Sequence, residues 1–82
     1  MELFFKDVAI KHLKQINLKD LQKAKRKFED LKANPFLGKP LHGKLSGERS
    51  IRAWPLRIIY TFDSAKQIIE IITVDYRGNV YK

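Results

Sequence analysis

The sequence predicts an α+β fold in which a helical hairpin packs on one face of a small antiparallel β-sheet. Two observations lead to this prediction. Apolar residues recur at helical spacing between about Asp7 and Lys32, and β-branched runs separated by turn residues fill the second half. We expect one domain over residues 1–82 with the order β-α-α-β-β-β, because no linker, repeat or low-complexity segment divides the chain.

The chain is predicted to begin with one strand and one helix. Glu2–Phe5 is short and apolar and precedes a helical pattern, which favours a first strand. A helix is expected over Asp7–Ile16, where apolar residues at spacings of three and four leave lysines on the other side. His12 has no partner at a useful spacing, so we expect a half-buried neighbour of the apolar face and no catalytic role.

A second helix is predicted to begin after Asn17, which can cap it, and to reach Lys32. Asp20 favours the exposed amides of its first turn. Six basic residues lie on its polar side: Lys19, Lys23, Lys25, Arg26, Lys27 and Lys32. Such a charge run is typical of a solvated helix face, and the alternative partner is RNA phosphate. Asn34-Pro35 ends the helix, because the residue before proline is pushed out of the helical region.

The sheet is predicted from the second half of the chain. Ser50–Tyr60 reads as two antiparallel strands broken at Pro55, since proline cannot donate to a ladder, and the second strand runs from Arg57 to Asp63. The nearly continuous β-branched run Gln67–Val74 predicts a central strand buried on both faces. Trp54, beside the break, is expected to fill a gap against the helices, with stacking on a nucleic-acid base as the alternative.

Charge indicates the class of partner. Seventeen Lys and Arg against nine Asp and Glu give a net charge of +8, which attracts polyanions, nucleic acid first, acidic protein second and anionic membrane third. The absence of cysteine excludes disulfides and thiolate chemistry. No apolar run is long enough to span a bilayer and no secretory leader is visible, so we expect a soluble cytoplasmic protein.

A basic surface is expected on the sheet. Arg52 and Arg57 should lie close together across a tight turn. Two planar guanidinium groups on adjacent strands suit a phosphodiester or another anion, although solvated strand arginines are the alternative. The preceding connection adds Lys39, His42 and Lys44. His42 is interpreted as a substrate contact or proton carrier, or else as a plain surface histidine.

The sequence favours chemistry without a metal or cofactor, because no metal-ligand cluster, phosphate loop or nucleophile-histidine-acid set is visible. Attack of an RNA 2′-hydroxyl on its own phosphate needs a base, positive groups that stabilise the charge, and a donor for the leaving oxygen. Tyr76 or Tyr81 could exchange protons if neighbouring cations lowered the pKa of the hydroxyl. The candidates for this chemistry gather at strand ends: Arg52, Arg57, Arg77, Lys44 and Tyr81.

Several segments, taken in their order and spacing along the chain, carry a family resemblance. They are Asn34-Pro35-Phe36, Gly43-Lys44-Leu45-Ser46-Gly47, Ile51-Arg52, Arg57-Ile58-Ile59-Tyr60, Val74, Arg77 and Val80-Tyr81. These segments resemble the RelE/ParE superfamily of toxins from toxin-antitoxin pairs, over nearly the whole chain. The resemblance implies a RelE-like β-α-α-β-β-β fold and, from the RelE branch, metal-free cleavage of mRNA in the ribosomal decoding site.

The resemblance implies roles for the site residues. Arg57 would stabilise the transition state, and Arg77 would contact the phosphate and assist the leaving group. Lys44 and Arg52 would hold the RNA backbone. Tyr81 would stack on the nucleotide or deprotonate it. The residues expected to bind substrate are Lys44, Tyr76, His42 and Lys39.

Two positions depart from the superfamily pattern. Many relatives carry Gly followed by His or Lys just before the matching Arg77, whereas this chain carries Asp75-Tyr76. A histidine base is missing there, and Asp75 adds a negative charge close to the expected phosphate. Ser50 stands where a second basic residue would precede Arg52. The identity of the general base therefore stays open.

Three functions are compatible with the resemblance. The first is a ribosome-dependent mRNA endonuclease of the RelE branch, favoured by Tyr81 after Arg77. The second is a ParE-type toxin that inhibits DNA gyrase by binding. The third is a toxin-like fold without activity that binds an antitoxin or RNA. The resemblance also implies an acidic antitoxin whose segment folds over the toxin in a hetero-oligomer, which fits the charge of +8.

Overall fold

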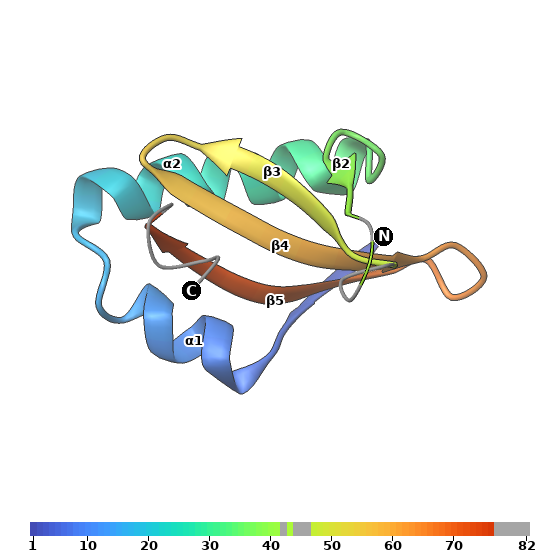
Figure 1. The fold of residues 1–82 in the computed structure, drawn as a ribbon, viewed down its shortest axis with the longest axis horizontal. Helices are drawn as coiled ribbons and strands as arrows, with labels where there is room; N and C mark the ends of the chain where they lie inside the picture. The colour runs from blue at the N-terminus through green and yellow to red at the C-terminus, as the bar shows by residue number, and fades with distance from the viewer. Residues whose placement is uncertain (42, 44–46, 77–82) are drawn as a thin grey trace.

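A computed structural model describes residues 1–41, 43 and 47–76 of the chain (Figure 1). The predicted α+β fold is confirmed, with two helices packed on a sheet. Neither helix in the described residues is long and apolar enough to cross a bilayer. The helices and strands are, in chain order, β1 (Glu2–Phe5), α1 (Asp7–Leu13), α2 (Leu18–Ala33), β2 (Lys39–Pro40), β3 (Arg49–Ala53), β4 (Leu56–Asp63) and β5 (Ile68–Tyr76).

Within the described residues, the sheet has five strands in the order β1-β5-β4-β3-β2 (Figure 1). The pairs β2-β3, β3-β4 and β4-β5 are antiparallel as predicted, but β1 runs parallel to β5, so the sheet is mixed and not purely antiparallel. A hairpin sequence shows the relative direction of its own two strands. Nothing local sets the direction in which β1 meets β5, because they are the first and last strands of the described chain.

β5 lies between β1 and β4, which confirms the predicted interior position, but it is buried on one face and not on both. A bulge at Ile72 shifts its register: Ile71 pairs with Tyr60, whereas Thr73 pairs with Ile59. Beyond the bulge, side chains point to the opposite faces from those of an unbroken strand. The fully buried side chains of β5 are Ile69, Ile71 and Val74.

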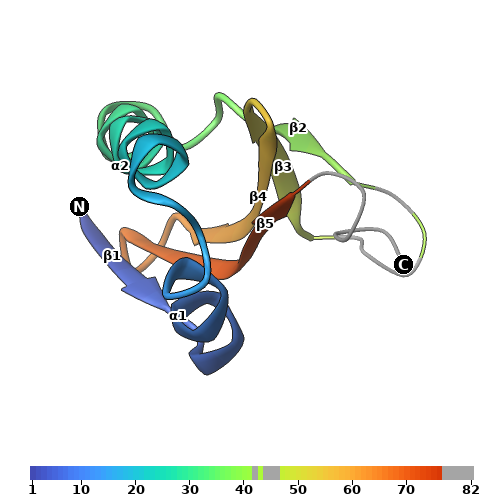
Figure 2. The same cartoon turned by 90° about the vertical axis from the view of Figure 1, so that its left-hand side faces the viewer.

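α2 covers one face of the sheet, and the core lies between them (Figure 2). Asn17 caps α2 as predicted, because its Oδ1 accepts a hydrogen bond of 2.9 Å from the N–H of Asp20. The ring of Phe28 meets that of Phe5 edge-on at 5.2 Å. Among the described residues, no helix covers the opposite face of β3 and β4. We call this face the open face; Arg52 is exposed on it, whereas Ser50 and Ile59 on the same face are buried.

α1 lies along the edge of β5, beyond the end of β1 (Figure 1), rather than beside α2 over the sheet. The N–H of Lys6 still donates to the carbonyl of Ile71 at 2.9 Å, and the chain then turns into the helix. α1 ends at Leu13, before the predicted Ile16, whose N–H bonds to the carbonyl only three residues back. α1 can therefore reach side chains on the open face.

The hydroxyl of Tyr60 ties the segment after α2 to the middle of the sheet. It donates to the carbonyl of Pro35 at 2.7 Å and accepts from the N–H of Gly38 at 2.9 Å. A Cβ on Gly38 would lie 2.6 Å from this oxygen, so the backbone comes this close only because glycine has no side chain. Arg49 Nη1 adds a bond of 2.8 Å to the carbonyl of Gly38. The approach to β2 is thus fixed.

Replacing Tyr60 with Phe should lower the free energy of unfolding by about 1–3 kcal/mol. The ring would stay, but the buried N–H of Gly38 and carbonyl of Pro35 would lose their partner. Urea unfolding followed by circular dichroism measures the change. An unchanged unfolding free energy would contradict the role given to the hydroxyl.

Tyr60 should also make the protein less stable at high pH. Burial raises the pKa of its hydroxyl above the ordinary value of 10, and the Gly38 N–H and the charge of Arg49 offset this only in part. The unfolded chain releases this proton near pH 10, so the stabilisation is complete below that pH and is lost as the pH rises through the folded pKa. The unfolding free energy should fall more steeply above about pH 10 in the native protein than in Tyr60→Phe. Parallel curves would show that Tyr60 does not contribute.

Candidate functional site

Two arginines lie opposite each other on the open face of the sheet. Arg52 of β3 pairs in register with Arg57 of β4, as predicted from the turn between them. Arg57 Nη1 donates a hydrogen bond of 3.1 Å to Ser50 Oγ, and Ser50 is only 5% exposed. A buried hydroxyl therefore orients the Arg57 guanidinium, while Arg52 remains exposed.

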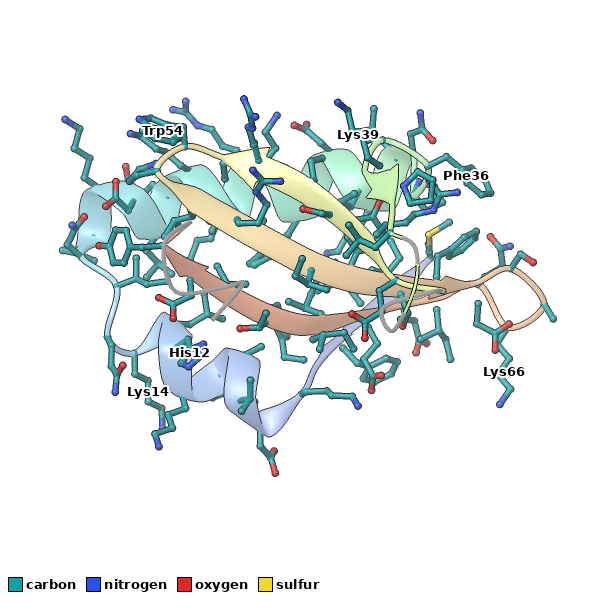
Figure 3. All side chains as sticks on the ribbon, viewed as in Figure 1. His12, Lys14, Phe36, Lys39, Trp54 and Lys66 are labelled. Carbon is teal, nitrogen blue, oxygen red and sulfur yellow. The ribbon has the colours of Figure 1, made fainter. Side chains whose placement is uncertain are left out.

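A hollow of about 290 Å³ lies beside these arginines. Three of its side chains are cationic and come from the neighbouring strands β2, β3 and β4: Lys39, Arg52 and Arg57. Figure 3 shows Lys39 on β2. The other described residues of the wall are Leu37, Ser50 and Ile51, so none of them is acidic. This arrangement forms an anion site that suits a phosphate group.

Aromatic packing holds the wall of this hollow. The ring of Phe36 meets that of Phe62 edge-on at 5.3 Å. The guanidinium of Arg49 lies 5.1 Å from the centre of the Phe36 ring, on the side chain that also bonds to Gly38. Lys39 follows directly after this clamped segment, so its backbone is fixed relative to β3.

His12 and Asp75 form a polar pair at the edge of the same face. Asp75 pairs in register with Arg57, which confirms that its negative charge lies near the arginines. His12 Nδ1 lies 3.8 Å from Asp75 Oδ2 and 3.0 Å from Thr73 Oγ1. His12 is half-buried as predicted, but it does have a partner, contrary to the expectation from sequence spacing. A carboxylate beside a histidine is an arrangement that can orient the ring for proton transfer.

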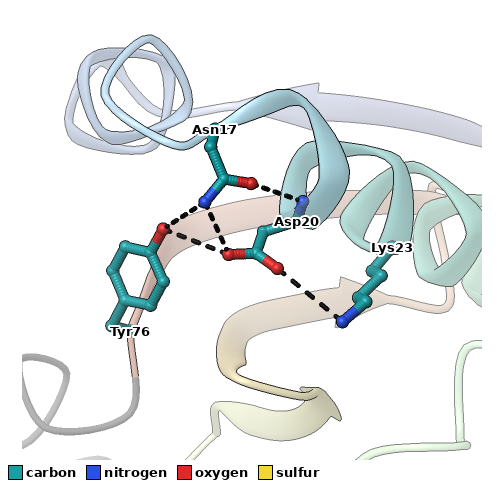
Figure 4. A network of polar contacts seen from close by, with 4 residues as sticks. All are labelled: Asn17, Asp20, Lys23 and Tyr76. Carbon is teal, nitrogen blue, oxygen red and sulfur yellow. Dashed lines mark hydrogen bonds and ion pairs between the residues drawn. The ribbon is translucent and has the colours of Figure 1, made fainter.

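The Tyr76 side chain contacts the start of α2 (Figure 4). It lies on the opposite face of the sheet from Arg57, because its neighbour Asp75 is the residue that pairs with Arg57. Its hydroxyl donates to Asp20 Oδ2 at 3.2 Å and accepts from Asn17 Nδ2 at 3.3 Å. Asp20 Oδ1 in turn lies 3.7 Å from Lys23 Nζ. Partial burial and the bond to Asp20 raise the pKa of the Tyr76 hydroxyl, whereas the predicted proton exchange requires a lowered one. The predicted roles of Tyr76 in proton transfer and substrate binding do not fit this geometry.

The remaining predictions concern Trp54, a metal site, and the site residues that the structure does not describe. Trp54 does not fill a gap against the helices as expected, because the residue is 63% exposed at the turn between β3 and β4 (Figure 3). Within the described ranges, no three histidine or acidic side chains lie close enough together to hold a metal ion. The site residues that lie outside the described residues are His42, Lys44, Arg77 and Tyr81.

Comparison with known protein families decides the relationship. The family model for the ParE toxin of type II toxin-antitoxin system, parDE, matches residues 3–81, nearly the whole chain. The chain belongs to this toxin family. The predicted resemblance to the RelE/ParE superfamily is thereby confirmed.

Individual relatives agree with this assignment. The toxin is 36% identical over 56 residues to Toxin RelG of Mycobacterium tuberculosis, an aligned stretch that covers 67% of this chain and 64% of RelG. It superposes with a TM-score of 0.86 and 29% identity on a chain of the toxin-antitoxin complex RelBE2 from M. tuberculosis, covering 93% of this chain and 96% of that one. A chain of the YoeB-YefM complex from Staphylococcus aureus superposes with a TM-score of 0.78 and 25% identity, covering 92% of this chain and 94% of that one.

Removing the Tyr76 hydroxyl should destabilise the toxin without weakening its anion site. Tyr76→Phe loses the hydrogen bonds to Asn17 and Asp20, so the free energy of unfolding should fall. Urea unfolding and the fluorescence anisotropy of a labelled RNA oligonucleotide measure the two properties separately. Unchanged stability with weaker RNA binding would restore Tyr76 to the substrate site.

Proposed function

We propose that this toxin cleaves mRNA on the ribosome, by attack of an RNA 2′-hydroxyl on the adjoining phosphate. The observation that supports this most strongly is the hollow where Lys39, Arg52 and Arg57 meet. In the reaction the 2′-oxygen bonds to phosphorus as the bond to the 5′-oxygen breaks, and negative charge grows on the phosphate oxygens. Fixed cations aimed at that charge lower the barrier.

Arg57 is the residue best suited to stabilise the transition state, because Ser50 orients it within the hollow. Arg52, on the exposed rim, would hold the RNA backbone, and Lys39 would contact a neighbouring phosphate. The proposed reaction uses no metal or cofactor. The superfamily resemblance supplies three further roles: backbone contact for Lys44, leaving-group assistance for Arg77, and stacking or proton removal for Tyr81. His42 would contact the substrate because it belongs to the basic connection that precedes β3.

The proposal includes an acidic antitoxin that binds the toxin in a hetero-oligomer and keeps it inactive. The RelBE2 relative was solved as a toxin-antitoxin complex, and a net charge of +8 suits an acidic partner. Large apolar side chains are exposed at Phe4, Val8, Ile10 and Leu18, and a folding antitoxin segment would cover such surface. The toxin would act in the cytoplasm, where ribosomes are.

A ParE-type inhibitor that binds DNA gyrase is the second candidate, because the matching family model carries the ParE description. This function needs no bond cleavage. The third function compatible with the sequence is a toxin-like fold that binds only antitoxin or RNA. It would show neither mRNA cleavage nor inhibition of gyrase.

Cleavage of mRNA by purified toxin on programmed ribosomes tests the proposal. Arg57→Ala should lower the cleavage rate by roughly a hundredfold, as loss of one transition-state donor does. Lys14→Ala is a matched control, because it removes one positive charge just after the end of α1, away from the hollow (Figure 3), and should leave the rate unchanged.

Other outcomes would redirect the assignment. If Arg57→Ala lowers the cleavage rate only severalfold, Arg57 does not stabilise the transition state. Intact mRNA together with inhibited supercoiling by gyrase would favour the second candidate. Failure in both assays, with RNA or antitoxin still bound, would indicate a binding module.

A further inference from the structure

A second hollow, of about 460 Å³, lies between α2 and the turn that joins β3 to β4. α2 contributes three basic residues and one acid at helical spacing, which places them on one side of the helix. The turn contributes an arginine and the exposed tryptophan. We call this hollow the Trp54 groove, and its principal side chains are Lys23, Arg26, Lys27, Asp30, Arg52 and Trp54.

The Trp54 groove is strongly positive. Among the residues that the structure describes, four cationic side chains line it against one carboxylate, that of Asp30. Lys27 Nζ lies 3.8 Å from Asp30 Oδ2, and Lys23 pairs with Asp20 at 3.7 Å. Within the described residues, no carboxylate forms an ion pair with Arg26 or Arg52. These two guanidinium groups therefore leave an uncompensated attraction for an anion.

Trp54 is the unusual member of the groove. This residue is 63% exposed beside these cations, although burying an indole ring stabilises a fold strongly. Aromatic rings next to a positive groove are the arrangement by which proteins bind single-stranded nucleic acid, because bases stack on the ring while phosphates meet the cations. The ring and the charges thus point to the same kind of ligand.

The Trp54 groove is continuous with the anion site. Arg52 lines both hollows, and its opposite partner in the hairpin is Arg57. A strand whose phosphate lies at Arg57 can therefore pass over Arg52 to Trp54. This continuity favours a nucleic-acid strand over a separate acidic peptide.

We propose that the Trp54 groove binds the single-stranded RNA next to the cleavage site, with one base stacked on Trp54 and phosphates on Arg26 and Arg52. That this strand is the mRNA being cleaved rests on the proposed function. That the groove suits a single-stranded nucleic acid rests only on its charges and its exposed ring. The groove would add affinity for any single-stranded RNA, since neither stacking nor phosphate contact reads base identity.

Binding can be measured without cleavage. A 2′-O-methyl RNA oligonucleotide has no free 2′-hydroxyl, and Trp54 is the single tryptophan of the chain. The oligonucleotide should quench the intrinsic tryptophan fluorescence on titration. With a labelled oligonucleotide and fluorescence anisotropy, Trp54→Leu should bind roughly tenfold more weakly, whereas Trp54→Phe, which keeps an aromatic face, should keep most of the affinity.

Charge is tested in the same assay. Arg26→Gln should reduce the slope of log affinity against log salt by about 0.7, the value for one single-stranded phosphate contact. Lys66→Gln removes the same charge from the β4–β5 turn, away from the groove (Figure 3), and should change the slope less. Thermal melting of each variant checks that the fold is retained.

The outcomes separate this inference from the proposed function. If the oligonucleotide quenches Trp54 and the variants bind as expected but no cleavage occurs, the RNA-binding groove is supported and the nuclease function is contradicted. Cleavage by the native toxin with no quenching, or with Trp54→Leu and Arg26→Gln binding normally, would overturn the groove. Polyglutamate that quenches Trp54 as strongly as the oligonucleotide would also overturn it, because the groove would then select charge alone or an acidic protein.

Discussion

The hydroxyl of Tyr60 is the contact on which the site depends. It sits on the buried face of β4 yet fixes the segment that forms a wall of the hollow on the other side. Its two hydrogen bonds hold Pro35 and Gly38 against the sheet, and Lys39 follows at once. Because a Cβ at Gly38 would lie 2.6 Å from this oxygen, the geometry tolerates no side chain there. A residue of the core therefore positions a cation of the surface.

Strand alternation separates stability from function in this protein. On β4, Leu56, Ile58 and Tyr60 face α2 and are buried, whereas Arg57 points to the other face. An arginine packed into the core would lose its hydration without a compensating partner, so the open face is where the cations can gather. The short β1 pairs only with the first half of β5. The second half of β5 contacts α1 instead, which brings His12 to the same face as Arg57.

The local features of the site could be predicted from the sequence, and the long-range ones could not. The pairing of Arg52 with Arg57 follows from a hairpin whose two strands are adjacent in the chain. The side to which Tyr76 points depends on a bulge at Ile72, inside a run of β-branched residues that contains no glycine or other sign of irregularity. The partner of His12 depends on where the first strand enters the sheet. The periodicity of apolar residues predicts the helices and strands, but these contacts depend on the register in which the strands pair.

The length of β2 explains why the two hollows meet. β2 has only two residues, and they pair with Arg49 and Ser50, at the start of β3. No strand in the described part of the chain covers the edge of β3 from Ile51 onward, so Arg52 borders the anion site on one side and α2 on the other. A longer β2 would pair with this edge and separate the two hollows. Arginine suits the junction better than lysine, because its planar fork can donate to two phosphate groups at once.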